Sequence, residues 1–297
     1  MGYKTMDANE AVSRVSYKFT EIAGIYPITP ASPMAEKVDV LASKGEINFW
    51  GNKVKVIEME SEKGAIATVH GALQAGVLAT TYTASQGLLL MIPSIYKMAG
   101  EMLPGVIHVA ARSLSTHSLS IFGDHQDIYA TRMSGVCMLC SNNPIEAYHL
   151  ANVAHLAAIK SSLPFIHFFD GFRTSHEINK IRLINNDKIK ELIDKKSLND
   201  FRAKAINPER PNTRGTAQNE DTYFQCMEVR NKFYEDAILD VCYYMDKVNK
   251  ICKTNYKPFN YYGADNPDTI IIAMGSVCDT IHETVSYLND KYNKKYG

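Results

Sequence analysis

Six short apolar runs recur along the first 170 residues, and segments with helical spacing separate them. The runs are IAGIYPI (22–28), VKVIEM (54–59), GVLATTYTA (76–84), GVIHVAA (105–111), GVCMLCS (135–141) and PFIHFFD (164–170). Their apolar residues follow one another with little polar alternation, which is typical of strands buried on both faces. Buried strands that alternate with helices predict an α/β fold with a doubly wound parallel sheet.

Several residues between these runs predict where helices begin. Asp7 can cap a helix over 8–20, and Thr29 precedes Pro30 as a capping residue precedes a proline at the first helical position. Pro144 opens a segment whose apolar residues recur every three or four positions. Sites in doubly wound sheets form at the carboxyl ends of the strands, so the residues that follow each run are candidates for chemistry.

The pattern changes after residue 171. Residues 177–200 predict one or two exposed charged helices, and 201–225 predict an irregular arm before a long helix that ends near 250. After a linker, residues 269–293 read as one strand, a glycine turn and one helix, a pair too small to close its own core. We therefore expect one domain over 1–256 and the beginning of a second α/β domain over 257–297.

Composition and charge exclude some classes of protein. The chain has 297 residues, 45% hydrophobic and 22% charged, and its 32 Lys and Arg equal its 32 Asp and Glu. No global field attracts nucleic acid or an acidic membrane surface. No apolar run reaches membrane-spanning length, and the polar N-terminus lacks a signal core. We expect a cytoplasmic protein that binds neither nucleic acid nor a membrane.

Six cysteines are present, and only Cys137 and Cys140 have the spacing of metal ligands. They lie in an apolar run that reads as a strand, with no second pair to complete a metal site. Buried structural thiols are the favoured interpretation, and we expect no metal in this chain.

Three carboxylates crowd the stretch VIEMESEKGAIA (56–67), which ends a predicted strand and opens a helix of small residues. Glu58 and Glu60 share a face if the strand extends to them, and Glu62 falls in the first turn of the helix. The small residues would let another backbone or a flat ring approach closely. The alternative is tight helix packing, with the carboxylates serving as helix caps.

Polar residues follow three other predicted strands. Thr29 follows the first, Thr83, Ser85 and Gln86 follow the third, and Arg112 follows the fourth; capping is the alternative for the hydroxyls. A guanidinium after a buried strand needs an anionic partner, either a substrate or one of the glutamates.

Two histidines and several missing motifs complete the picture. His117 and His125 are more often packing or helix-start residues than metal ligands. The sequence contains no G-x-G-x-x-G, Walker loop, metalloprotease helix or nucleophile elbow. A nicotinamide or ATP enzyme is therefore not expected, and the residues alone name no reaction.

Five stretches add what spacing cannot: IYPITPASPMAE, EMESEKGAIATVHGALQAG, TYTASQGLLLMIPSIYKMAGE, HVAARSLSTHSLSIFGDHQD and PFIHFFDGFRTSHE. Together with INPERPNTRGTAQN from the arm, they resemble the N-terminal domain of pyruvate:ferredoxin (flavodoxin) oxidoreductase. The resemblance covers about 1–256, and the residues after it look like the start of the family's second domain. Enzymes of that family are much longer than this chain.

The resemblance implies a thiamin-diphosphate-dependent enzyme. It would decarboxylate pyruvate, make acetyl-CoA with coenzyme A and pass electrons through [4Fe-4S] clusters to ferredoxin or flavodoxin. A homodimer and a setting in anaerobic metabolism are also implied. The cysteine sets for the clusters and the motif for magnesium and the diphosphate are missing here, so both belong to the remainder of the enzyme. We expect this chain to bind the cofactor weakly and not to turn over alone.

The resemblance also implies roles for individual residues. Glu62 would hydrogen-bond the cofactor's pyrimidine ring as the catalytic acid, with Thr83, Ser85 and Gln86 as further cofactor contacts. Arg112 and Thr29 would hold the carboxylate and oxo group of pyruvate. A glutamate that donates a hydrogen bond must be protonated, which an apolar helix wall and nearby carboxylates would favour.

Two other functions remain open. One is a non-catalytic assembly subunit that keeps the fold, and the other is a subunit of an oxidoreductase for a different 2-oxoacid. The first would show no pyruvate-dependent change even with its partners added, and substrate competition would identify the second.

Overall fold

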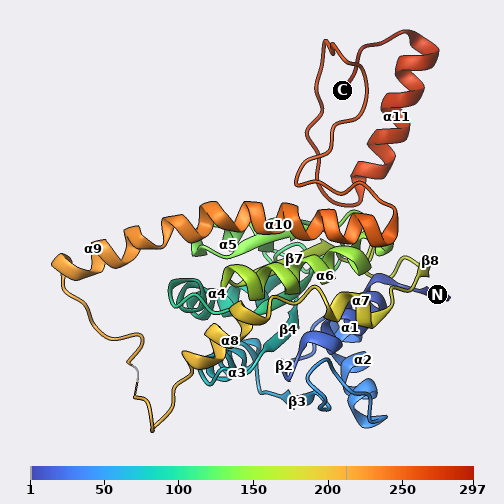
Figure 1. The fold of residues 1–297 in the computed structure, drawn as a ribbon. Coiled ribbons are helices and arrows are strands. Elements are labelled where there is room, and N and C mark those ends of the chain that lie inside the picture. Colours follow the sequence, from blue (N-terminus) through green and yellow to red (C-terminus); the bar gives the residue numbers. More distant parts are fainter. Residues whose placement is uncertain (1, 212) are drawn as a thin grey trace.

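A six-stranded sheet forms the centre of the computed structural model, which describes residues 2–211 and 213–297 (Figure 1). Every neighbouring pair of its strands is parallel. In spatial order the strands are β3 (Lys55–Glu58), β2 (Ile22–Ile25), β4 (Ala79–Thr83), β5 (Val106–Ala111), β7 (Phe165–Asp170) and β6 (Cys137–Cys140). Each of the six apolar runs forms one strand, which confirms the predicted parallel α/β sheet.

Helices cover both faces of the sheet. On one face α1 (Ala8–Phe19) contacts α2 (Ser32–Ser43) and α6 (Pro144–Ser161). The other group comprises α3 (Glu62–Gln74), α4 (Ser85–Gly100) and α5 (Gln126–Thr131), which is followed by a short 3₁₀ turn, η1 (Arg132–Ser134). Because helices cover both faces, every residue of β4 and β5 is buried.

Two of the three predicted helix starts are confirmed. The Asp7 carboxylate accepts a hydrogen bond from the Glu10 amide at the start of α1, and α6 begins at Pro144. The prediction for Thr29 is wrong, since α2 begins later, after Ala31. The Ile28 carbonyl accepts hydrogen bonds from the amides of Ala31 and Ser32, so a tight turn occupies the position where the helix was expected to begin.

The segment after residue 171 differs partly from expectation. The first of the predicted charged helices is instead β8 (Asn179–Arg182), which pairs antiparallel with β1 (Tyr3–Met6). Ile181 alone is buried there between exposed and half-buried residues, a two-residue period that the charged composition obscured. Short helices follow, α7 (Asn186–Lys190) and α8 (Lys195–Ala203).

The arm and the long helix come next. Helix α9 (Glu220–Val229) takes the last part of the predicted arm, in which position 212 lies outside the described residues. Helix α10 (Asn231–Cys252) then packs against α6 and ends close to the predicted position.

The last forty residues project from the sheet domain (Figure 1). The predicted glycine turn and helix are present as Gly275, at φ +85°, and α11 (Val277–Tyr292). The predicted strand before them is wrong. Thr269 makes one isolated bridge to Tyr296, and Ile272 is 95% exposed. A strand needs a neighbouring strand to satisfy its backbone. In the described residues the backbone bonds of 268–271 go to the last three residues, 295–297, and no continuous ladder forms.

The CxxC pair lies in β6 at the edge of the sheet. Both thiols are free and partly buried, and burial raises the pKa of Cys137 to about 12 and that of Cys140 further. They therefore stay protonated, as structural thiols do. In the part of the chain that the structure describes, no helix is long and apolar enough to cross a bilayer.

Candidate active site

The parallel sheet brings all six predicted site residues to one edge. They come directly after, or at the end of, four neighbouring strands: Thr29 after β2, Glu62 after β3, Thr83, Ser85 and Gln86 at the end of β4, and Arg112 after β5. Strands that run in one direction must end at one edge, so residues more than 80 positions apart meet there.

Only one of the three crowded carboxylates faces the protein interior. Glu62 is the first residue of α3 and is 7% exposed, whereas Glu58 and Glu60 are both exposed. Water screens those two charges, so the expectation that they act on Glu62 is wrong. Ser61, not a glutamate, caps the helix by accepting from the Gly64 amide at 3.3 Å.

The small residues of α3 have separate structural explanations. Gly24 of β2 faces the helix, and an added Cβ there would lie 2.6 Å from the Ala65 carbonyl oxygen. Helix α3 therefore packs closely on the sheet, as the alternative interpretation held. Gly71, by contrast, is exposed and an added Cβ would meet nothing within 4 Å.

Gly87 lets the head of α4 approach Glu62. An added Cβ at Gly87 would lie 2.7 Å from Glu62 Oε1 and 2.6 Å from Thr83 Oγ1, closer than any real contact. A side chain at this position would displace one of the two. The Thr83 hydroxyl is buried and has no hydrogen-bond partner, so a polar atom is left unsatisfied beside the buried glutamate.

Arg112 lies at the centre of the group and is 6% exposed. Its Nη1 donates to the Thr29 carbonyl at 2.6 Å, and its Nη2 donates to Gln86 Oε1 at 3.5 Å. Its Nε is buried without a partner. Burial lowers the pKa of Arg112, and the nearby charges of Asp127 and Glu62 oppose this effect.

Among the described residues no carboxylate forms an ion pair with Arg112. The alternative that this guanidinium serves a structural salt bridge to a glutamate is therefore wrong. A buried cation without an anion is costly, so the site is suited to an anionic ligand.

The remaining predicted residues position loops as well as facing the site. Thr29 is exposed and contributes its carbonyl to Arg112. The Ser85 hydroxyl donates to the Ser113 carbonyl at 2.7 Å, and Gln86 Nε2 donates to the Ser115 carbonyl at 3.0 Å. Neither the Thr29 hydroxyl nor the Ser85 hydroxyl caps a helix. A role in cofactor binding stays a prediction for Thr83, Ser85 and Gln86.

Sequence reasoning missed Asp127. This residue of α5 is fully buried and accepts backbone hydrogen bonds from Ser85 at 2.7 Å, Arg112 at 3.1 Å and Ile128 at 2.8 Å. Burial raises its pKa to about 6 although these bonds oppose the shift. The stretch GDHQD offers two aspartates, and periodicity could not say which one faces inward.

His117 and His125 lie in different surroundings. His117 is exposed, and its ring contacts the Thr116 hydroxyl at 3.3 Å. His125 Nε2 lies 2.6 Å from Asp170 Oδ1 at the end of β7, and this hydrogen bond raises the pKa of His125. In the described part of the chain no cluster of three potential ligands could hold a metal ion.

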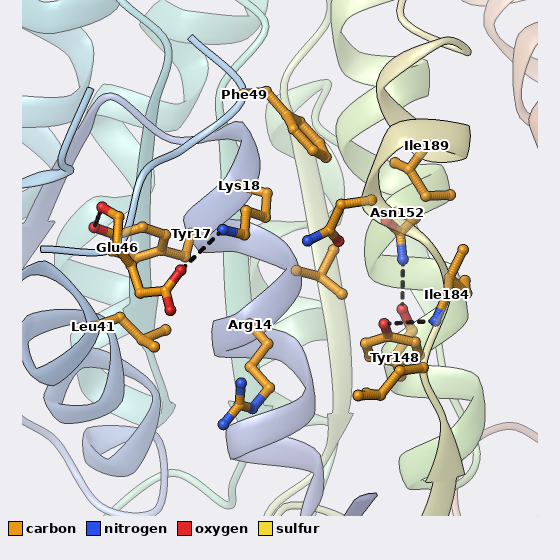
Figure 2. Close-up of a pocket in the computed structure, with 13 residues that line it drawn as sticks. Arg14, Tyr17, Lys18, Leu41, Glu46, Phe49, Tyr148, Asn152, Ile184 and Ile189 are labelled. Carbon is orange, nitrogen blue, oxygen red and sulfur yellow. Dashed lines mark hydrogen bonds and ion pairs between the residues drawn. The ribbon is translucent and has the colours of Figure 1, made fainter. Parts of the chain in front are cut away.

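A cavity of about 220 Å³ lies elsewhere, lined by residues of α1, α2, α6 and α7 and of the segments that follow α2 and β8 (Figure 2). Lys18 and Glu46 form an ion pair across it at 3.3 Å, and the Tyr148 hydroxyl accepts from the Ile184 amide. None of the predicted site residues lines it. The strand-end site is therefore identified by its unsatisfied polar atoms and not by its concavity.

A family model described as "pyruvate flavodoxin/ferredoxin oxidoreductase, thiamine diP-binding" matches residues 14–244. The chain belongs to this family. The matched range contains all six predicted site residues and Asp127, so the strand-end site lies within the family's thiamine-diphosphate-binding domain.

Proteins similar to this chain over nearly its whole length are named pyruvate-flavodoxin or pyruvate:ferredoxin oxidoreductases. The chain is 55% identical over 287 residues to a pyruvate-flavodoxin oxidoreductase of Klebsiella pneumoniae, covering 96% of this chain and 24% of that protein. It is 51% identical to a pyruvate:ferredoxin oxidoreductase of Moorella thermoacetica, covering 99% of this chain and 25% of that protein. The chain thus spans about a quarter of the length of these relatives.

A solved structure shares the fold at low identity. The 2-oxoglutarate:ferredoxin oxidoreductase of Magnetococcus marinus, solved with 2-oxoglutarate, coenzyme A and succinyl-CoA bound, superposes with a TM-score of 0.68 at 19% identity. The match covers 99% of this chain and 52% of that one. At this identity it supports the architecture alone.

The residues at the strand ends fit the cofactor that the family description names. Glu62 is a buried carboxyl at a helix start, Thr83 offers an unsatisfied hydroxyl beside it, and Gly87 leaves room that a Cβ would fill. A heteroaromatic ring with donor and acceptor nitrogens can satisfy such groups.

Proposed function

We propose that this chain supplies the pyrimidine-binding and pyruvate-binding half of the active site of a pyruvate:ferredoxin or flavodoxin oxidoreductase, EC 1.2.7.1. The reaction is the oxidative decarboxylation of pyruvate to acetyl-CoA. Pyruvate and coenzyme A give acetyl-CoA, carbon dioxide and a proton, and two electrons pass to the acceptor.

The observation that carries this proposal is the buried Arg112 guanidinium, which has an unpaired Nε and no carboxylate partner among the described residues. A pyruvate carboxylate supplies the missing anion, and the planar fork of arginine suits two oxygens. Thr29 lies next to Arg112 and holds the oxo group of the substrate.

Glu62 acts on the cofactor. Thiamine diphosphate, when bound, supplies the nucleophilic carbon and the electron sink that decarboxylation needs. Glu62 would hydrogen-bond the pyrimidine ring of the bound cofactor, which makes it the catalytic acid of this chain. Thr83, Ser85 and Gln86 would complete the contacts to the cofactor.

Other parts of the enzyme supply the rest. We place magnesium, the diphosphate site and the [4Fe-4S] clusters outside this chain, together with the binding of ferredoxin or flavodoxin. Residues 257–297 begin a second α/β domain, and 1–256 form the first. The enzyme acts as a homodimer in the cytoplasm.

The test is an assay of the holoenzyme that contains this chain. Pyruvate-dependent reduction of methyl viologen should require coenzyme A and thiamine diphosphate. No reduction with pyruvate, together with turnover of 2-oxoglutarate or 2-oxobutyrate, would move the chain to an enzyme for another 2-oxoacid. No reduction with any 2-oxoacid would support an assembly role.

A further inference from the structure

The carboxylate of Asp127 joins two of the strand ends that form the proposed site. Its Oδ2 accepts from the Ser85 amide at the head of α4 and from the Arg112 amide after β5. These two residues are 27 positions apart and belong to neighbouring strands. One oxygen atom therefore fixes the distance between the head of α4, which carries Gln86, and the loop that carries Arg112.

The second oxygen is also in use. Asp127 Oδ1 accepts from the Ile128 amide at 2.8 Å, within its own helix α5. The side chain is fully buried, so water cannot replace a lost bond. A proton on either oxygen occupies one acceptor position and removes the negative charge, so it weakens the bonds from the three backbone donors.

The backbone on the α4 side is strained. Ser85 has φ +50°, a left-handed conformation that a residue with a side chain rarely adopts. Its amide donates to Asp127 and its hydroxyl donates to the Ser113 carbonyl, which directly follows Arg112. One bond to α5 and one bond to the segment after β5 thus hold the strained residue in place.

The same conformation sets the position of Gln86. Gln86 Oε1 accepts from Arg112 Nη2 and lies beside the Ser85 hydroxyl, whose single proton serves the Ser113 carbonyl. The direction of the guanidinium therefore depends on the Ser85 turn and, through it, on the Asp127 carboxylate.

We propose that Asp127 is a positioning residue for pyruvate binding: its carboxylate holds the Ser85 turn and the Arg112 backbone so that the guanidinium faces the substrate carboxylate. This inference rests on the proposed function and adds a residue outside the site predicted from sequence. It also makes pyruvate binding sensitive to pH, because protonated Asp127 holds the three backbone donors less strongly than the carboxylate does.

The charged groups that face Asp127 come from two directions. Arg112 approaches from the segment after β5, and His125, which in turn interacts with Asp170 and Asp124, lies just before α5. Helix α4 meets Asp127 through the Ser85 backbone amide, which carries no charge. Burial raises the pKa of Asp127 to about 6, so loss of its negative charge falls in an accessible range.

The experiment compares Asp127→Asn with wild type in the holoenzyme that contains this chain, with pyruvate and methyl viologen. The amide keeps the size of the side chain and turns one acceptor into a donor, which faces a backbone N–H. We expect KM for pyruvate to rise about tenfold or more, as loss of bonds to a charged group does, with a much smaller change in kcat.

The pH profile separates positioning from general damage. In wild type, kcat/KM for pyruvate should fall as the pH drops below about 6, because Asp127 gains a proton there. In Asp127→Asn this limb should be missing. The matched control is Glu146→Gln, which also alters a partly buried carboxylate that accepts a backbone amide, from Asn142, but away from the proposed site.

An unchanged KM and an unchanged acid limb in Asp127→Asn would overturn the inference, as would an equal effect of Glu146→Gln. If Asp127→Asn does not fold, the wild-type profile decides: a KM for pyruvate that stays constant from pH 7.5 to 5 contradicts the inference. Failure of the proposed function looks different, because wild type itself would then show no pyruvate-dependent reduction.

Discussion

Two sets of buried polar residues, one at the strand ends and one around His108, lie on the same sheet and differ in whether their hydrogen bonds are satisfied. At the strand ends, Thr83 and Arg112 each keep a buried polar atom without a partner. Four residues before Arg112 on the same strand, His108 bridges His155 and His167 at 3.1 and 3.0 Å, and His167 contacts the Ser141 hydroxyl at 2.8 Å. No nitrogen of these rings is among the unsatisfied buried atoms of the described residues.

This difference separates a site from a structural core. A satisfied buried network stabilises one packing arrangement, whereas unsatisfied buried atoms cost free energy that a ligand can recover. Asn9 and Thr81 also keep such an atom, so the site is marked by the combination of Thr83 and Arg112 with the buried Glu62 carboxyl at the strand ends. Burial lowers the pKa of all three histidines, so they are neutral at pH 7, and none faces the strand-end residues through a hydrogen bond. We therefore expect substitutions among the strand-end residues to change catalysis and substitutions among the histidines to change stability.

The largest effect is expected at Glu62. Glu62→Gln keeps the shape of the side chain and removes the acid, so kcat of the holoenzyme with pyruvate should fall by about 100-fold or more. The free energy of unfolding of the chain, from urea titration, should change little. Wild-type turnover in this variant would end the assignment of Glu62 as the catalytic acid.

A smaller effect is expected from Gly87→Ala. The new Cβ would overlap Glu62 Oε1 and Thr83 Oγ1, so one must move, and strain of this kind corresponds to about a tenfold rise in the apparent constant for thiamine diphosphate. Titration of the complete enzyme, freed of its cofactor, with thiamine diphosphate measures this constant.

The control for Gly87 is Gly71→Ala on the exposed face of α3. No atom lies within 4 Å of the added Cβ there, and alanine stabilises a helix interior relative to glycine by ~0.5–1 kcal/mol. Cofactor affinity should stay at the wild-type value. Equal losses in the two variants would mean that the packing of Gly87 has no special relation to Glu62.

The smallest effect on catalysis, and a distinct effect on stability, is expected from the histidines. Burial lowers the pKa of His155 and His167 to about 3, whereas an unfolded histidine titrates near about 6.5. Between these values the unfolded chain binds protons that the folded chain rejects. Stability is therefore full above pH 6.5 and falls as the pH drops toward 3.

His167→Asn should weaken this dependence. From pH 7 to pH 5 the wild-type chain should lose on the order of 1–2 kcal/mol per buried histidine, and the variant should lose one such contribution less. Urea titrations at the two pH values measure the difference. An identical pH dependence in variant and wild type would show that His167 is not held neutral, and a selective loss of kcat would assign the histidines to the site.

The sequence predicted the sheet well because burial on both faces leaves a strong signal: all six apolar runs became strands. It predicted the edge at which Thr29, Glu62 and Arg112 meet, because parallel strands end together. It failed where partners distant in sequence decide the outcome. The pairing of β8 with β1 and the exposed Ile272 segment both depend on whether a neighbouring strand is present.

Contacts between residues distant in sequence also explain what the sequence did not predict at the site. Nothing in the sequence shows that Ser85 adopts a positive φ, or that the Asp127 carboxylate reaches two strand ends at once. Likewise, Glu58 and Glu60 read as neighbours of Glu62 although the chain turns them into solvent. Local spacing gives the order of residues, and the side-chain direction comes from tertiary packing.

The most direct test concerns the unpaired guanidinium of Arg112. In the holoenzyme, Arg112→Leu should raise KM for pyruvate about 100-fold and Arg112→Lys about tenfold, because lysine keeps the charge and loses the fork. The apparent constant for thiamine diphosphate should stay unchanged in both. Equal KM values for leucine and lysine, or values equal to wild type, would contradict the account.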